Sequence, residues 1–140
     1  MGRFAERTKV PVERSKSELD QLLQKHGATQ RALLQDDDTG RAAVQFRLAD
    51  RMIRLELVCP GGTKGGERID RERRRIWRAL LLLVKAKLEM VADGATTVER
   101  EFLADILLPD GKRVHELLGP QLVSSYKSGK MPPLLPPVGG

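Results

Sequence analysis

Six arginines fall within eleven residues of this sequence, in the segment 68–78. On a helix, four of them share one side within two turns, opposite the apolar stripe: Arg71, Arg74, Arg75 and Arg78. Guanidinium groups arranged in this way can bind several consecutive phosphates through forked pairs of N–H donors. The spacing therefore predicts contact with the backbone of a nucleic acid. The alternative is a solvated helix face, neutralised by the acidic residues nearby.

The glycine-rich stretch GGTKGG before the arginines has only part of a phosphate-binding loop. Gly61 and Gly66 have the spacing of that motif. Glu67 and Arg68, however, stand where the motif requires a lysine and then a serine or threonine, so it would hold neither phosphate nor magnesium. We therefore expect a connector here and no nucleotide cofactor.

The other chemically capable residues do not form a recognisable active site or metal site. Asp36–Asp38 is typical of a turn, and no further carboxylate follows at the spacing of a cation-binding loop. His26 and His115 have no serine or cysteine partner at a known spacing. Cys59, the only cysteine, closes an apolar strand pattern. We expect a non-enzymatic protein without catalytic residues, metal or cofactor.

Composition and charge narrow the class of protein. The chain has 140 residues, of which 40% are hydrophobic and 31% charged, as in one globular domain. Its formal net charge of +6 favours anionic partners. The longest apolar run, 79–84, is too short to span a membrane, and the single cysteine fits a reducing compartment. We expect a cytoplasmic protein with no membrane partner.

Hydrophobic periodicity predicts an α+β fold. A helix over about 16–26 follows a capping box formed by Ser15 and Glu18. From 29 to 60 apolar and polar residues alternate, which predicts a three-stranded antiparallel meander with turns at 36–40 and 49–51. A long helix over about 67–92 then packs on the apolar face of the sheet. Arg47 and Arg54 lie on the open face and are secondary candidates for binding nucleic acid.

The C-terminal part is predicted to be a helical extension. Thr96 and Glu99 have the spacing of a second capping box, and Gly119-Pro120 is expected to break the helical pattern that begins near Val114. The predicted organisation is an extended basic arm (1–14), a single α+β domain (15–126) and a proline-rich tail (127–140).

Five blocks of the sequence resemble, in the same order, a family of small proteins found in bacteriophages and integrated mobile elements. The blocks are ERTKVPVERSKSELDQLLQKHGAT, FRLADRMIRLEL, WRALLLLVKAKLEMV, EFLADILLPDGKRVHELLGP and YKSGKMPPLLP. The resemblance covers most of the chain and brings no established catalytic or binding residues. It implies an origin in the cytoplasm of a bacterial host, and a part in phage DNA metabolism or in interference with host defence.

Two functions remain open. The first is a basic accessory protein that binds DNA or RNA through backbone phosphates, a function compatible with the element order helix, three strands, helix, which is also that of double-stranded-RNA-binding domains. The second is a protein–protein interaction module, either a structural subunit or an inhibitor, that engages its partner through the long helix or the segment 131–137.

Overall fold

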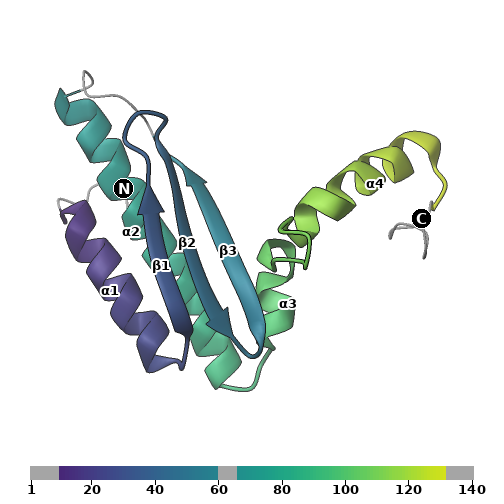
Figure 1. Cartoon of the computed structure of the whole chain (residues 1–140), viewed down its shortest axis with the longest axis horizontal. Coiled ribbons are helices and arrows are strands. Elements are labelled where there is room, and N and C mark those ends of the chain that lie inside the picture. Colours follow the sequence, from purple (N-terminus) through teal and green to yellow (C-terminus); the bar gives the residue numbers. More distant parts are fainter. Residues whose placement is uncertain (1–9, 60–65, 132–140) are drawn as a thin grey trace.

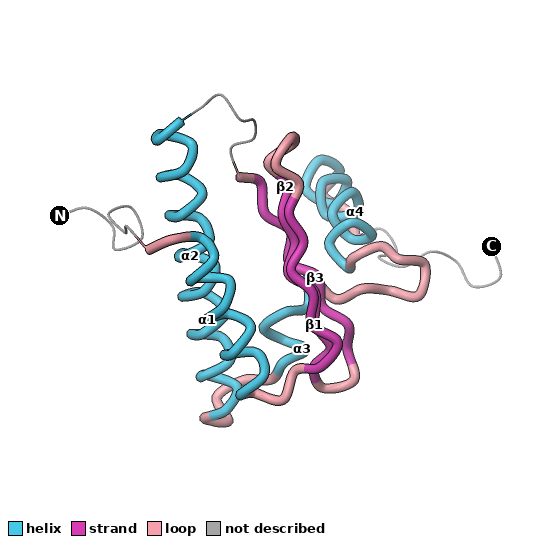
Figure 2. Tube along the Cα trace, turned by 60° about the vertical axis from the view of Figure 1, so that its left-hand side comes forward, coloured by secondary structure: helices cyan, strands magenta, loops and turns pink. Residues whose placement is uncertain are grey.

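The structure, a computed structural model, describes residues 10–59 and 66–131. Its elements are α1 (Val12–Lys25), β1 (Thr29–Gln35), β2 (Arg41–Leu48), β3 (Arg51–Val58), α2 (Gly66–Ala92), α3 (Val98–Phe102), the short 3-10 helix η2 (Leu103–Asp105) and α4 (Val114–Ser128). The three strands form one antiparallel sheet in the order β1-β2-β3. Helices α1 and α2 cover one face of this sheet, and α4 lies on its other side (Figures 1 and 2). The predicted α+β fold is confirmed.

The core lies between the sheet and the two helices. Alternation along β2 and β3 turns Val44, Phe46 and Ile53 toward the helices, and all three are fully buried. From α2 the helical spacing brings a matching apolar stripe, whose buried members are Trp77, Leu80, Leu81, Val84 and Leu88. The strand residues between them, such as Gln45 and Arg54, face the other way. The sheet therefore has the apolar face and the polar face that the alternation predicted.

The outer edge of β3 is partly closed by the segment that leads to α4. Leu107 donates its N–H to the carbonyl of Met52 at 2.8 Å, and Ile106 bridges to Ile53. A turn at Pro109-Asp110-Gly111 follows, with Lys112 N–H donating to the Asp110 carboxylate. The chain thus leaves the sheet beside β3 and enters α4.

The first helix begins earlier than predicted. α1 starts at Val12 with Pro11 as its N-cap, so residues 12–14, assigned to the extended arm, are helical. Ser15 lies inside the helix and is fully buried, and no capping box forms there. Proline is well suited to the start of a helix because its missing N–H is not needed there, and Val12 packs against the core. Residues 1–9 lie outside the described residues.

The C-terminal helices also differ from the prediction. Thr97, not Thr96, caps α3 by accepting the N–H of Arg100, while the Thr96 hydroxyl donates to Glu101. α4 continues through Gly119 and Pro120 to Ser128, although an internal proline removes one helical hydrogen bond and crowds the carbonyl of Glu116. Lys127 and Ser128 therefore belong to the helix and not to the tail. The connector residues 60–65 and the tail residues 132–140 lie outside the described residues.

Candidate nucleic-acid interface

Of the four predicted arginines, Arg78 pairs with Glu18 of α1, and Arg74 lines a hollow together with Pro11 and Val12 at the start of α1. These two therefore flank the apolar stripe on the side of α1, whereas the prediction placed all four opposite the stripe. Arg78 Nη1 donates to Glu18 Oε2 of α1 at 2.8 Å, which fixes the seam between the two helices. Arg71 is exposed, whereas Arg74, Arg75 and Arg78 are half-buried.

Two of these arginines have carboxylate partners. Arg78 pairs with Glu18, and Arg75 Nη2 lies 3.0 Å from Glu72 Oε2 within the same helix. The hydrogen bond from Arg78 lowers the pKa of Glu18, and the one from Arg75 lowers the pKa of Glu72, so both carboxylates are ionised at neutral pH. Within the described residues, Arg71 and Arg74 form no ion pair. Ion pairs therefore offset the charges of Arg75 and Arg78, whereas Arg71 and Arg74 have no carboxylate partner among the described residues.

An open groove of about 320 Å³ follows the seam between α1 and α2. Its lining includes two lysines beside Arg78, one from each helix: Lys25 at the end of α1 and Lys85 of α2. We give the name cationic row to these three residues together with the three arginines that precede Arg78 on the same side of α2: Arg71, Arg74, Arg75, Arg78, Lys85 and Lys25. From residue 71 to residue 85 the row extends over roughly 21 Å, at 1.5 Å per helical residue.

Several polar atoms in this part of the molecule are buried without a partner. Within the described residues, Ser15 Oγ, Arg74 Nε and Trp77 Nε1 have no hydrogen-bond partner. The Lys16 ammonium lies 5.0 Å from the centre of the Trp77 ring, in cation–π contact. The α1–α2 interface therefore contains two buried N–H donors, Arg74 Nε and Trp77 Nε1, that no acceptor among the described residues satisfies.

The N-terminal end of α2 has a different character. Here Arg73 lies beside the β1–β2 turn, with Nη1 3.7 Å from Asp37 Oδ1. The turn is held by Asp36, whose carboxylate accepts the N–H groups of Asp38 and Thr39. The predicted turn at 36–40 is thus confirmed, and its carboxylate Asp37 lies in the same hollow as Arg73 and Arg74 of α2.

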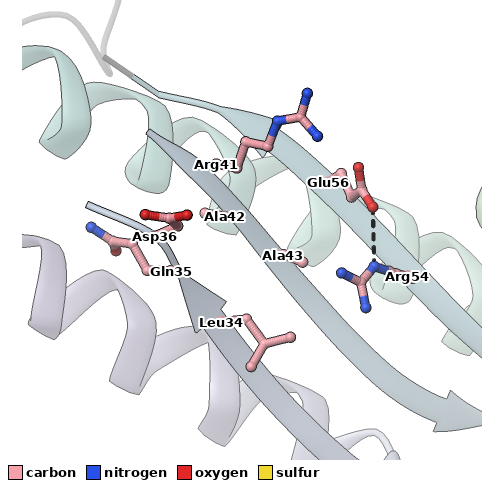
Figure 3. Close-up of a pocket in the computed structure, with 8 residues that line it drawn as sticks. All are labelled: Leu34, Gln35, Asp36, Arg41, Ala42, Ala43, Arg54 and Glu56. Atoms are coloured by element: carbon pink, nitrogen blue, oxygen red, sulfur yellow. Dashed lines mark hydrogen bonds and ion pairs between the residues drawn. The ribbon is translucent and has the colours of Figure 1, made fainter. Parts of the chain in front are cut away.

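Arg47 and Arg54 lie on the opposite face of the sheet. Arg54 is held between Glu56, at 3.1 Å, and Gln45, at 3.2 Å, and Arg47 lies 3.7 Å from Asp50. Figure 3 shows Arg54 beside Glu56, next to a hollow of about 270 Å³ over β1 and β2. The sheet separates these two arginines from α2. The six predicted residues therefore form two groups on opposite sides of the sheet, and they do not make one continuous surface.

Neither lysine of the cationic row was among the predicted contacts, and Lys25 is the one that the helical pattern of α2 does not indicate. In the sequence it is the last residue of a helix, where a basic residue is favoured by the helix dipole. Nothing local indicates that it lies across a groove from Lys85, sixty residues later. The remaining candidates give no second site: Cys59 is buried, and burial raises the pKa of its thiol.

Comparisons with known proteins do not assign a family. No family model, curated protein or solved structure matches the chain. Among residues 10–59 and 66–131, no helix is long and apolar enough to cross a membrane. The same residues contain no group of three or more His, Cys, Asp or Glu side chains placed to hold a metal ion. The resemblance to phage proteins stays a prediction.

Proposed function

We propose that this chain is a non-enzymatic accessory protein of a phage or mobile element that binds nucleic acid through its backbone phosphates. The observation that supports this proposal best is the cationic row. Five of its six basic side chains follow one side of α2, and Lys25 of α1 lies across the groove from Lys85; within the row, Arg78 pairs with Glu18 and Arg75 with Glu72. Lysine and arginine in such a row attract a polyanion without reading its sequence.

The length of the row sets the number of phosphates. One strand of a duplex presents a phosphate about every 3.4 Å along the axis, so roughly six phosphates pass along a 21 Å row. Arg75 and Arg78 keep carboxylate partners, which leaves four side chains for net neutralisation: Arg71, Arg74, Lys85 and Lys25. Each neutralised phosphate contributes about −0.9 to the slope of log K against log salt. We expect a slope of about −3 to −4.

The proposal is tested by binding measurements on matched variants. Arg71→Gln/Lys85→Gln removes two exposed charges from the row, and Arg100→Gln/Lys112→Gln removes two exposed charges elsewhere. With labelled DNA and RNA duplexes, the first variant should bind several-fold more weakly and lose about 2 from its salt slope, while the second keeps the wild-type slope. Equal losses in both variants would show that only net charge matters and would contradict the proposed interface.

A second candidate function is that of a protein-interaction module. It is supported by α4, which exposes Leu122, Val123 and Tyr126 and has no buried side chain. Salt separates the two candidates, since phosphate binding weakens steeply as salt rises and an interface centred on apolar side chains changes much less. A partner retained from host lysate after nuclease treatment and at high salt would favour the second candidate.

A further inference from the structure

The groove between α1 and α2 differs in charge from one end to the other. The two helices run in the same direction (Figure 1). Each lines the groove with residues three and four positions apart, which share one face of a helix. α1 contributes Glu18, Gln21, Leu22 and Lys25, and α2 contributes Arg78, Leu81, Leu82 and Lys85. Glu18 and Arg78 form an ion pair at one end of the groove, whereas Lys25 and Lys85 lie across from each other at the other end.

The lysine end of the groove keeps its positive charge. Within residues 10–59 and 66–131, neither Lys25 nor Lys85 forms an ion pair, and both side chains are exposed. This holds even for Glu89, which stands one helical turn after Lys85. The carboxylate inside the groove, Glu18, accepts hydrogen bonds from Arg78 and Arg14 at the opposite end. The lysine end therefore carries two positive charges that no described carboxylate offsets.

Both lysines can reach a single anion. The axes of packed helices lie about 8–10 Å apart, and a lysine side chain is a flexible stem that ends in three N–H donors. The ammonium groups of Lys25 and Lys85 can therefore converge on one oxyanion in the groove. Two like charges repel each other, and an anion between them replaces this repulsion by two attractions. Charge complementarity thus favours a group that carries two negative charges.

Among the phosphates of a nucleic acid, the terminal one has this charge. A phosphate monoester carries a charge of about −1.5 to −2 at pH 7, whereas each phosphate inside a strand carries one negative charge. Lysine binds phosphate as a point charge and so suits the exposed oxygens of a terminal group. Leu22 and Leu82, both half-buried, lie between the lysine end and the ion pair, where they offer an apolar surface to the sugar that bears the phosphate.

We propose that Lys25 and Lys85 bind the terminal phosphate of a nucleic-acid strand, and that the following phosphates lie along the cationic row toward Arg71. Lys25 is the last residue of α1, and Lys85 is the last member of the row along α2, so the strand ends where the row ends. This inference rests on the proposed function. It adds that the protein recognises strand ends that carry a phosphate.

Binding of the full-length protein to three duplexes of one sequence tests the proposal, with each duplex made in DNA and in RNA. All strand ends carry hydroxyl groups in the first duplex, phosphates in the second and phosphate methyl esters in the third. The ester keeps the terminal phosphorus and its oxygens but has only one negative charge. We expect wild type to bind the phosphorylated duplex several-fold more tightly than the hydroxyl duplex, with the ester between them. Lys25→Gln/Lys85→Gln should bind all three equally.

Arg68→Gln/Arg71→Gln is the matched control, because it removes two exposed charges at the other end of α2. It should bind all three duplexes more weakly and keep the wild-type ratio between them. The emission of buried Trp77 reports whether each variant is folded. A wild type that binds the three duplexes equally, or a preference that survives Lys25→Gln/Lys85→Gln, would overturn this inference and leave the proposed function intact. No binding to any duplex would contradict the proposed function, and this inference with it.

Discussion

At the scale of single residues, Glu18 is the main internal partner of the cationic row. Its carboxylate accepts hydrogen bonds from Arg14, one turn earlier in α1, and from Arg78 of α2. The bond from Arg78 is the larger cause of the lowered pKa of Glu18. Because Glu18 remains 37% exposed, solvent screens the interaction and limits its contribution to stability. Arg78 therefore joins two helices and also contributes to the cationic row.

We predict that Arg78→Gln lowers the free energy of unfolding by about 0.5 kcal/mol at pH 7. A carboxylate whose pKa is lowered by folding stabilises the protein above its unfolded-state pKa, and this stabilisation is lost as pH falls through the folded-state value. The difference between wild type and the variant should therefore shrink below about pH 4. Urea denaturation from pH 7 to pH 3 measures this difference in the free energy of unfolding, with Glu18→Gln and the double variant Glu18→Gln/Arg78→Gln measured alongside. A difference that does not change with pH would assign the effect to the packing of the Arg78 side chain.

At the scale of elements, the β2–β3 hairpin combines good pairing with a strained turn. The strands stay in register from Arg41 and Val58 to Leu48 and Arg51, which leaves a loop of two residues. Both loop residues have positive φ, 50° at Ala49 and 59° at Asp50. Two-residue hairpins favour this turn because its twist matches that of the strands, and they favour Asn-Gly in it. Alanine is a poor choice there, since its side chain crowds the backbone in the left-handed region.

We predict that Ala49→Asn/Asp50→Gly raises the free energy of unfolding by about 1 kcal/mol. The weak Arg47–Asp50 pair that is lost lies at 3.7 Å on the surface and contributes little. Urea denaturation compares this variant with wild type and with Ala49→Val. The valine variant should be less stable than wild type, because a branched side chain is strongly disfavoured at positive φ. No gain from Asn-Gly would show that other contacts set the conformation of the turn.

At the scale of the whole molecule, α3 joins the sheet to the C-terminal helix. Phe102 of α3 is buried and meets Phe46 of β2 edge to face, with ring centres 5.8 Å apart. The Lys87 ammonium of α2 lies 5.4 Å from the centre of the Phe102 ring. A single side chain thus touches the sheet and the long helix and positions the segment that follows along β3.

We predict that Phe102→Ala lowers the free energy of unfolding by about 3–4 kcal/mol, since it leaves a cavity where sheet and helices meet. The adjacent Leu103 is 48% exposed, and Leu103→Ala should change stability by less than about 1 kcal/mol. Denaturation followed by the emission of Trp77, the only tryptophan, measures both. Similar effects of the two substitutions would contradict the role assigned to Phe102.

Local patterns predicted most of the fold. The alternation of Val44 and Phe46 with Gln45 identified β2 and its two faces, and the spacing of Trp77, Leu81 and Val84 identified the buried stripe of α2. The starts and ends of helices were predicted less well: α1 begins before Ser15, and α4 continues through Pro120. Cap and breaker signals are weak, since they involve one or two residues and packing can override them.

The sequence by itself determined the periodicities, the net positive charge and the grouping of arginines in α2, because these depend only on residue type and spacing. The tertiary structure alone decided which of those charges are paired and which lie side by side. It placed Glu18 against Arg78, sixty residues away, brought Lys25 next to Lys85, and separated Arg47 and Arg54 from the row by a sheet. It also left α4 without cover. Such relations arise from contacts between distant segments, and no local pattern encodes them.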